Sequence, residues 1–589
     1  MKSASISGCF FKYCLLFYFL LLTNLNAANV NVSSDNEIES DDTSNKYIFD
    51  AADQTLTIKS DVTAGASSAN QNIQINEQNN ATLVIESGAT LQGTNTLIKG
   101  NDADGLTVTN SGTISASTNR AINLLDATNA TITNNSGATI SSETGNTING
   151  AVNNDSVSGN TVTNSGTIYA TSGVAVRFYN NSTSTTITNN SGGVIYNNSN
   201  DETIRLGGSS TLTNAGKIEN KKDPSKDAID IEGNSSTITL KDGGILIGKI
   251  RSAGTSNTLK IQHGVGQSYF YKTAGNDMTL QDLDGNQIVK GSASSVGQGG
   301  SETQDELLGY KSLNIRKSLN RYKKNKNNLD DNKGWGETYG SFIKRDQHNS
   351  NLSLGYNFLN LGVNLVYPLE KSDHILSFET GRQEFTKDHN INHFSFLSGV
   401  NFSSTNSEIF ILGGAALHDS ERTILTNTTT TGKLDLDDTY YSLKALIGSK
   451  FKNEKLIPDI GFTAGYSITP EHNESKYYTW KTKSTLNFST YIEDEYNFIS
   501  IGEKNNLNLG WVIDFRKLVF GKEQDYEING TKATYTQDND LTEEVIFSAN
   551  AEFIKKISNS EKLSFALDGF LSTQETSGLQ ASIYYIMKL

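Results

Sequence analysis

A short motif recurs along the first half of the chain at intervals near 25 residues, and this period constrains the fold more than any other feature. Eight copies begin at threonines 55, 82, 107, 131, 161, 186, 211 and 237, separated by 27, 25, 24, 30, 25, 25 and 26 residues. Two copies, at 107–114 and 161–168, share the sequence TVTNSGTI. A fixed period of this length indicates a solenoid, in which each repeat forms one coil that stacks on the next.

Each period holds at least two short runs in which apolar and polar residues alternate, as in β-strands. The motif itself is one run, and RAINLL from Arg120 and GVAVRF from Gly173 are examples of the other. Threonine, valine and isoleucine are frequent while good helix formers are scarce, which argues against a helical solenoid. Because a strand rises about 3.3 Å per residue, one period traces roughly 85 Å. This perimeter predicts a right-handed parallel β-helix with three short sides, filling residues 47–300.

An asparagine stands three residues after the leading threonine in the five central copies, at Asn110, Asn134, Asn164, Asn189 and Asn214. Equivalent residues stack in neighbouring rungs, so we expect these amides to form a hydrogen-bonded ladder. Glycines follow at Gly112, Gly137, Gly166, Gly192 and Gly216, where we expect a turn with positive φ. The copies at Thr55, Thr82 and Thr237 lack the asparagine and are expected to be end rungs.

The first 27 residues predict a secretory signal peptide. Lys2 and Lys12 are their only charges, an apolar run follows at 13–22, and TNLNAA offers a cleavage site after Ala27. The run is too short for a comfortable membrane span. A lipoprotein signal ending at Cys9 is the alternative, but Cys9 precedes the apolar run instead of following it. Both cysteines lie in this segment, so the exported chain has none, and residues 28–46 are expected to be a flexible spacer.

The formal net charge of the chain is -15. No basic stripe is present to meet phosphates, so the sequence argues against a nucleic-acid partner. The acidity itself indicates solubility and weak association.

From about residue 330 to 589 the sequence changes to longer alternating runs of 9–12 residues with many aromatics. Phe394, Phe396, Val400 and Phe402 form one such run, and Ala581, Ile583, Tyr585, Met587 and Leu589 form the last. This length and period predict transmembrane β-strands, about a dozen in all. A soluble β-sandwich also alternates, but the signal peptide and the apolar final strand favour a barrel. Long polar segments from His418 and Gly521 are expected to be extracellular loops, and short turns to face the periplasm.

Residues 301–329 are expected to be a linker helix between the solenoid and the barrel, with the helical pattern itself running from Ser301 to Asn325. Leu307, Leu308, Leu313, Ile315 and Leu319 recur at roughly helical spacing. Acidic residues begin the segment and basic residues end it, which matches the helix dipole at both ends. A helix of about 20 residues spans about 30 Å, the thickness of a membrane.

The order of signal, β-helix, helix and terminal barrel resembles that of the classical monomeric autotransporters, the type V secreted proteins. The segments GWGETYGSF from Gly334 and ASIYYIMKL at the C-terminus carry the resemblance most specifically. It implies an outer-membrane barrel inserted by the barrel assembly machinery, a helix that threads its pore, and a monomeric passenger displayed outside. It also implies that residues from about 255 form closing rungs that start passenger folding.

Two features depart from this family's pattern. The terminal residue is Leu589, where phenylalanine or tryptophan is commonest, which weakens the expected recognition by the assembly machinery. Some members cut themselves between paired asparagines inside the pore helix, whereas Asn327–Asn328 follows the expected helix here. We therefore expect no self-cleavage.

The solenoid sequence gives little support for an enzyme. His263 is the only histidine before the barrel, and without cysteine neither a Cys–His pair nor a Ser–His–Asp triad has its base within the rod. Asp227, Asp230 and Glu232 lie on one strand with Arg205 one rung below, and such carboxylates would suit acid and base on a polysaccharide. Alternating acids are more often a solvated face. We expect no catalytic, cofactor or metal site, although calcium at this cluster or at NDADG from Asn101 stays open.

The expected role is therefore adhesion or another surface interaction with an unidentified ligand, a step taken by family analogy. A surface-displayed, polysaccharide-active enzyme is the alternative.

Overall fold

The computed structural model describes residues 27–588 except 67–70, 151–156, 290–292, 296–302, 327–332, 349–353, 388, 454–455, 503–504, 529–530, 538–540 and 559–560. The expected signal peptide therefore lies almost entirely outside the described residues. The chain forms two compact units. Unit 1 holds Met1–His263, Phe270–Asp284 and Leu425–Lys433, and unit 2 holds Gly264–Tyr269, Gly285–Ile424 and Leu434–Leu589. No helix in the described part of the chain combines the length and apolar character needed to cross a membrane.

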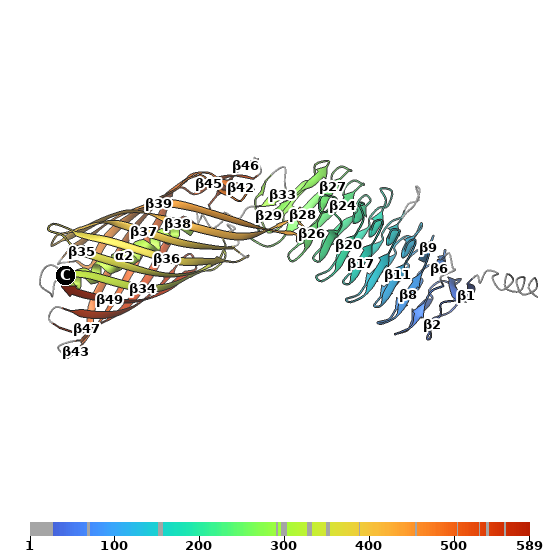
Figure 1. Cartoon of the computed structure of the whole chain (residues 1–589), viewed down its shortest axis with the longest axis horizontal. Coiled ribbons are helices and arrows are strands. Elements are labelled where there is room, and N and C mark those ends of the chain that lie inside the picture. Colours follow the sequence, from blue (N-terminus) through green and yellow to red (C-terminus); the bar gives the residue numbers. More distant parts are fainter. Residues whose placement is uncertain are drawn as a thin grey trace, which may run out of the picture. The chain divides into compact units, whose positions relative to one another are not determined.

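Unit 1 is a parallel β-solenoid built from three sheets (Figure 1). Sheet A consists of β1 (Ala28–Val32), β3 (Asn45–Phe49), β6 (Gln71–Asn76), β9 (Thr96–Asn101), β12 (Ile122–Leu124), β15 (Ile148–Gly150), β18 (Val176–Phe178), β21 (Ile204–Leu206), β24 (Asp227–Ile231), β27 (Lys249–Ser252) and β30 (Thr273–Gly275). Sheet B consists of β2 (Asn36–Ile38), β4 (Thr55–Ile58), β7 (Thr82–Ile85), β10 (Thr107–Asn110), β13 (Thr131–Asn134), β16 (Thr161–Asn164), β19 (Thr186–Asn189), β22 (Thr211–Asn214), β25 (Thr237–Lys241), β28 (Thr258–Gln262) and β31 (Thr279–Asp282). Sheet C consists of β5 (Thr63–Ala64), β8 (Thr90–Gly93), β11 (Thr113–Ala116), β14 (Thr139–Ser142), β17 (Thr167–Ala170), β20 (Val194–Asn197), β23 (Lys217–Asn220) and β26 (Ile245–Ile247).

The asparagine ladder predicted from the repeat is confirmed. Each Nδ2 donates to Oδ1 of the asparagine in the next rung at 2.8 Å, from Asn110 through Asn134, Asn164 and Asn189 to Asn214. All five side chains are fully buried beside apolar residues such as Val108 and Ile132. The same amides also donate to backbone carbonyls, so the turn after each strand is tied to the ladder.

The reason predicted for the repeated glycines holds for only part of them. Gly137 and Gly192 have positive φ, of 80° and 82°. Gly112, Gly166 and Gly216 do not, and their glycine is required by space instead. A Cβ at these three positions would lie 2.2–2.3 Å from a backbone oxygen of the preceding rung, closer than any real contact. The spacing identified the glycines, but close stacking of the rungs was a second cause that the sequence did not reveal.

The solenoid also begins earlier than predicted. Residues 28–46, expected to be a flexible spacer, form β1 and β2 and enter β3. β1 pairs in parallel with β3, and β2 pairs with β4. This segment lacks the threonine–asparagine motif, so the repeat gave no sign of it.

Unit 2 contains a closed antiparallel barrel of twelve strands, as the alternation predicted (Figure 1). They are β34 (Lys333–Arg345), β35 (Tyr356–Pro368), β36 (Asp373–Phe385), β37 (His389–Ser403), β38 (Ser407–Thr426), β39 (Lys433–Asn453), β40 (Leu456–Thr469), β43 (Lys483–Ile501), β44 (Asn505–Phe520), β47 (Glu543–Lys556), β48 (Lys562–Ser572) and β49 (Thr576–Lys588). The first and last strands close the barrel through thirteen residue pairs, from Lys333–Lys588 to Arg345–Thr576.

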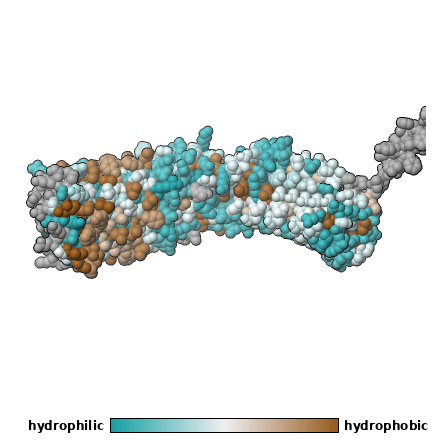
Figure 2. Space-filling model, turned by 60° about the horizontal axis from the view of Figure 1, so that its bottom comes forward, coloured by the Kyte–Doolittle hydropathy of each residue, from teal (hydrophilic) through white to brown (hydrophobic). Residues whose placement is uncertain are grey.

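The outer wall of the barrel is apolar, and Figure 2 shows hydrophobic side chains gathered on it. Phe394, Ile411, Leu443, Phe547 and Ile583 are among the exposed large side chains of the wall. Their sequence neighbours point inward, because successive side chains of a strand alternate between its faces. This pattern is that of a strand with lipid outside and a polar lumen inside.

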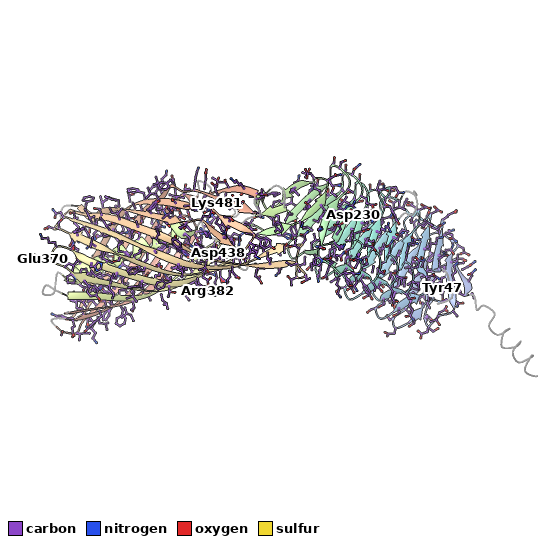
Figure 3. All side chains as sticks on the ribbon, turned by 45° about the horizontal axis from the view of Figure 1, so that its top comes forward. Tyr47, Asp230, Glu370, Arg382, Asp438 and Lys481 are labelled. Carbon is purple, nitrogen blue, oxygen red and sulfur yellow. The ribbon has the colours of Figure 1, made fainter. Side chains whose placement is uncertain are left out.

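The connections at the two ends of the barrel differ, as predicted. One end has short turns, such as 369–372 and 404–406. At the other end the connections 470–482 and 521–542 carry a four-stranded sheet of β41 (His472–Glu474), β42 (Tyr478–Trp480), β45 (Glu523–Ile528) and β46 (Thr531–Thr536). Figure 3 labels Glu370 at the short-turn end and Lys481 near this sheet.

The long loop expected from His418 is instead mostly strand. β38 and β39 extend for 20 and 21 residues and leave only 427–432 between them. Their polar ends keep the strand alternation, which sustains pairing past the apolar belt.

The single described helix, α2 (Thr303–Lys326), lies between the solenoid and the barrel in sequence, within the predicted 301–329. Three further short strands, β29 (Tyr269–Tyr271), β32 (Ile288–Val289) and β33 (Ala293–Ser295), precede it.

Candidate functional site in the barrel lumen

Helix α2 fills the lumen of the barrel (Figure 1). Its apolar side chains contact inward-facing residues of many strands. Ile315, Leu319 and Tyr322 belong to one buried cluster with Trp335 of β34 and Leu412 of β38, among others. A second buried cluster joins the first turns of the helix to strands that include β35 and β44. The helix is therefore packed as a core element of unit 2.

The charges of the helix are matched by the wall around it. Lys311 lies 3.2 Å from Glu379, and Lys317 lies 3.2 Å from Asp568. Arg316 pairs with Asp514, and its guanidinium also lies over the ring of Tyr491, 3.6 Å from the centroid. Basic residues of the helix thus meet carboxylates of the strands along the lumen.

Arg321 is the most completely enclosed of these cations. Its Nη1 donates to Oε1 of Glu337 at 3.0 Å, and its Nη2 donates to both oxygens of Asp568 at 2.6 and 2.7 Å. Arg321 is 2% exposed and Glu337 is fully buried. Two carboxylates from the first strand and the second-last strand are therefore compensated by one side chain of the helix.

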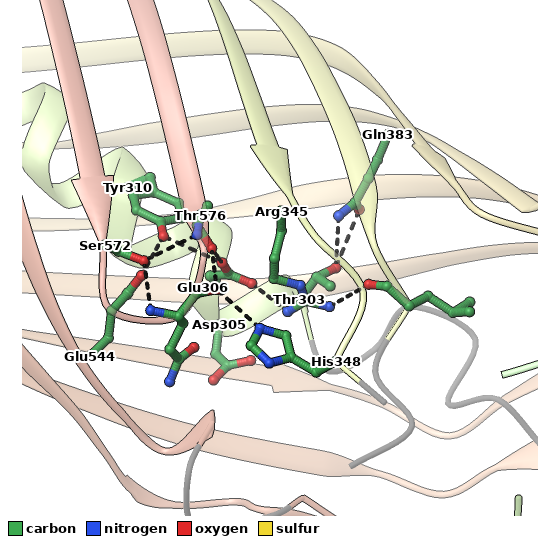
Figure 4. A network of polar contacts seen from close by, with 12 residues as sticks. Thr303, Asp305, Glu306, Tyr310, Arg345, His348, Gln383, Glu544, Ser572 and Thr576 are labelled. Atoms are coloured by element: carbon green, nitrogen blue, oxygen red, sulfur yellow. Dashed lines mark hydrogen bonds and ion pairs between the residues drawn. The ribbon is translucent and has the colours of Figure 1, made fainter. Parts of the chain in front are cut away.

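The first turn of α2 is held by a second network (Figure 4). Glu306 accepts from Nη1 of Arg345 at 2.7 Å and from Oγ1 of Thr576 at 3.0 Å. Tyr310 donates to Oε1 of Glu544 at 2.6 Å, and Thr303 accepts from Nε2 of Gln383 at 3.0 Å. Here the charges are reversed, because the carboxylate of Glu306 belongs to the helix and the guanidinium of Arg345 to the wall. A negative charge is favourable at a helix N-terminus.

This lumen is built to hold a helix. Four carboxylates of the wall, Glu337, Glu379, Asp514 and Asp568, pair with basic residues of the helix. Buried pairs of this kind resist separation because each partner would be left unpaired. The helix was predicted from the sequence, whereas Glu337, Glu379, Asp514 and Asp568 were not singled out. The sequence feature that could have identified these carboxylates is an acidic residue within an alternating strand, at a position that faces the lumen.

The acidic residues considered on the solenoid lie on β24 and just after it, where Figure 3 labels Asp230. Asp230 pairs in register with Arg205, one rung below as predicted, and accepts from Nη1 of Arg251 at 2.9 Å, one rung above. Arg205 in turn lies 2.5 Å from Glu202 and 2.9 Å from Glu232. The cluster is a ladder of ion pairs between rungs.

Burial raises the pKa of Asp230 to about 6, against the opposing effect of Arg251. The pKa of Asp227 is also raised, again chiefly by burial. Oδ1 of Asp230 has no hydrogen-bond partner among the residues that the structure describes. No group of three or more histidine, cysteine, aspartate or glutamate residues in this described set could hold a metal ion.

His263 is a buried residue of the solenoid. It is fully buried, and its ring nitrogens lie 3.1 Å from the backbone oxygen of Lys241 and 2.6 Å from the hydroxyl of Tyr271. The segment with Asn327–Asn328 lies outside the described residues, directly after α2.

Several solved structures match less than half of this chain. The translocator domain of the autotransporter NalP from Neisseria meningitidis matches at 8% identity over 48% of this chain and 98% of that one, with a TM-score of 0.33. The transport unit of the autotransporter AIDA-I from Escherichia coli matches at 7% identity over 44% and 90%, with a TM-score of 0.29. The monoaromatic hydrocarbon channel CymD matches at 9% identity over 44% and 88%, with a TM-score of 0.23. No family model and no curated protein matches the chain.

These similarities are too weak to indicate a function, which is inferred below from the order of the elements. The chain has a parallel β-solenoid, then a helix inside the lumen, then a closed twelve-stranded barrel. This order of elements is the one that the resemblance to the classical autotransporters implied from the sequence.

Proposed function

We propose that this chain is an outer-membrane autotransporter that displays its own solenoid on the cell surface. The observation that carries the proposal is helix α2 inside the closed barrel, with its charges matched to the wall. The chain passes from the solenoid to the first barrel strand through this lumen, so the lumen is a path for polypeptide across the barrel. The apolar outer wall suits a lipid bilayer.

The remaining steps of the proposal follow from the sequence. The signal peptide takes the chain across the inner membrane, and the barrel assembly machinery inserts the barrel as a monomer. The solenoid then serves adhesion or another surface interaction without catalysis. In support, the carboxylates on its β24 face are paired with arginines between rungs.

Protease added to intact cells tests the display. We expect cleavage within residues 47–296 while the barrel strands stay protected, because lipid covers their outer wall and α2 fills their lumen. A periplasmic marker protein in the same cells must survive, which shows that the outer membrane is closed. Recovery of an intact solenoid from the soluble periplasm would contradict the proposal.

The passenger is also expected to stay joined to the barrel. No cleavage chemistry is assigned to Asn327–Asn328, because this pair follows the helical pattern of the sequence. Mass spectrometry of the membrane-bound chain checks this, and a fragment that starts at Asn328 would disprove it.

A second candidate is a polysaccharide-active enzyme on the same anchor. Two observations favour it: the raised pKa of Asp230 and its free Oδ1. New reducing ends after incubation with acidic polysaccharides, absent from Asp230→Asn, would establish it in place of the non-catalytic role.

A further inference from the structure

The outward face of sheet B is an array of threonines in two columns. The first column holds threonine in ten consecutive rungs: Thr55, Thr82, Thr107, Thr131, Thr161, Thr186, Thr211, Thr237, Thr258 and Thr279. The second column holds Thr57, Val84, Thr109, Thr133, Thr163, Thr188, Thr213, Thr239, Lys260 and Gln281 in the same rungs. Every pair is in register from rung to rung, so each column is continuous along the solenoid.

The array is regular in two directions. Adjacent rungs of a sheet are about 4.8 Å apart, and two residues along a strand cover about 6.6 Å. Threonine is branched at Cβ, which restricts its first side-chain torsion in a strand. Behind the array, the buried asparagine ladder ties each rung to the next. The face is therefore a fixed grid of hydroxyl and methyl groups.

These hydroxyls are available to a ligand. Within the described part of the chain, no threonine side chain of the two columns makes a hydrogen bond to the protein, and all are at least partly open to solvent. From Thr82 to Thr239 neither column contains a charged or aromatic residue. The face thus offers a neutral surface that repeats the same small set of contacts.

The other two faces show that strand formation alone does not explain this uniformity. The equivalent column of sheet A holds Lys99, Asn123, Asn149, Arg177, Arg205, Asp230 and Arg251. Sheet C starts with threonines in its first column, but its second holds Gln92, Tyr169, Tyr196 and Glu219. Strand propensity favours valine, isoleucine and tyrosine as well as threonine. Only the first column of sheet B keeps the same side chain through ten consecutive rungs.

A ligand that fits this face is itself periodic, uncharged and rich in hydrogen bonds. Sites for organic molecules combine aromatic or apolar surface with a few placed polar groups, and from Thr82 to Thr239 the array has neither a ring nor an amide. Water ordered at a protein surface bonds as well as a direct protein partner would. We propose that sheet B binds ice: its hydroxyls join the surface water lattice and its methyls occupy the gaps between them.

The biological use of such binding, attachment of the cell to ice, rests on the proposed surface display. The binding itself does not, because purified protein meets ice directly. A failure of ice binding and a failure of display are therefore separate results of separate experiments.

The test uses the full-length chain purified in detergent. A dilute solution is frozen slowly, and the protein in the ice is compared with that in the remaining liquid. We expect the wild-type chain to be enriched in the ice. Thr163→Tyr, which places a ring in the middle of the second column, should lose the enrichment. Ser115→Tyr is the matched control on sheet C, whose own column already holds Tyr169 and Tyr196; it should behave as wild type.

Protease resistance of the solenoid in each variant shows that it has folded. If Thr163→Tyr fails this check, Thr163→Val replaces it, since valine keeps the shape and removes only the hydroxyl; it should reduce the enrichment. Exclusion of the wild-type chain from ice, or equal enrichment of Thr163→Tyr and Ser115→Tyr, would overturn the proposal. Retention on powdered cellulose or chitin that Thr163→Tyr abolishes, without enrichment in ice, would also overturn it and assign the face to polysaccharide.

Discussion

The solenoid and the barrel both bury polar side chains, but they satisfy them in different ways. In the solenoid, Asn134, Asn164 and Asn189 are fully buried, and each amide repeats the bond made by the previous one. In the barrel, Arg321 reaches two carboxylates that come from different strands. One arrangement is neutral and repetitive, and the other is charged and unique.

The chemistry of the groups explains this difference. An amide both donates and accepts, so a column of asparagines satisfies itself at every rung. A column of carboxylates would repel itself, since neighbouring like charges disfavour ionisation. Charges therefore suit a place where two different surfaces meet, as where α2 meets the wall. The comparison predicts that damage spreads between neighbouring rungs in the solenoid. In the barrel, loss of one cation instead leaves several carboxylates unpaired at once.

The largest effect is expected from Arg321→Ala. It leaves Glu337 and Asp568 without their main cation in the lumen, and breaking a buried pair from one side costs about 3–5 kcal/mol. We expect the folded barrel to unfold in dodecyl sulfate at a clearly lower temperature, measured by its shift in gel mobility. We also expect higher conductance in planar bilayers, because the helix is less firmly held in the pore.

Lys324→Ala is the matched control. Lys324 lies on the same helix and pairs with Glu495 at 2.7 Å, but about a third of its side chain is exposed. Its loss should shift the temperature little, since accessible pairs contribute about 0–1 kcal/mol. Adding Glu337→Gln and Asp568→Asn to Arg321→Ala should restore part of the stability. Equal shifts for Arg321→Ala and Lys324→Ala would show that burial of the charge pair is not what holds the helix.

These two interiors also differ in how far the sequence predicted them. The ladder could be predicted because a repeat fixes the register: once Asn110 and Asn134 are equivalent, their stacking follows from the period. The barrel strands could be predicted from alternation for a similar reason. In both cases the information is local and repeated many times.

The partners of the helix could not be predicted in the same way. That Arg321 meets both Glu337 and Asp568 depends on closure of β34 on β49 and on the depth of the helix in the lumen. Neither the closure of the barrel nor the depth of the helix produces a repeating pattern in the sequence. The first rung was missed because it lacks the motif, and the crowding at Gly166 was missed because it depends on the rung below.

The second largest effect is expected from Asn164→Ala. Asn164 accepts from Asn134 and donates to Asn189, each at 2.8 Å, so its loss leaves a buried group unpaired on both sides. Each unpaired group costs about 1–3 kcal/mol. The measurement is brief proteolysis of the full-length chain at graded urea concentrations. Tryptophan fluorescence is unsuitable because Trp335, Trp480 and Trp511 all belong to the barrel unit.

Asn180→Ala is its control, since Asn180 lies in an exposed turn where surface changes usually stay within about 0.5 kcal/mol. The Asn164→Ala solenoid should be cut at lower urea than either the wild type or Asn180→Ala. Its neighbouring rungs should open with it, because each rung of a solenoid is stabilised by the next. Equal midpoints for the two variants would mean that the ladder contributes no more than the surface does.

The smallest effect concerns Asp230, a charged side chain that the solenoid buries as the barrel buries its own. Its folded pKa of about 6 lies above the ordinary aspartate value of 3.8. Between these values the folded chain binds more protons than the unfolded chain, so the stabilising contribution is complete below about pH 4 and is lost as pH rises through 6. We expect the wild-type solenoid to resist urea less at pH 8 than at pH 5, by an amount on the order of one pKa unit, or about 1.4 kcal/mol.

In Asp230→Asn this part of the pH dependence should disappear, because the amide does not ionise. Glu232→Gln removes a carboxylate from the same cluster at a more exposed position, next to Arg205, and should keep the wild-type dependence. If Asp230→Asn instead loses stability equally at both pH values, the ion pair with Arg251 outweighs burial. The charge would then stabilise this rung as the lumen charges stabilise the barrel.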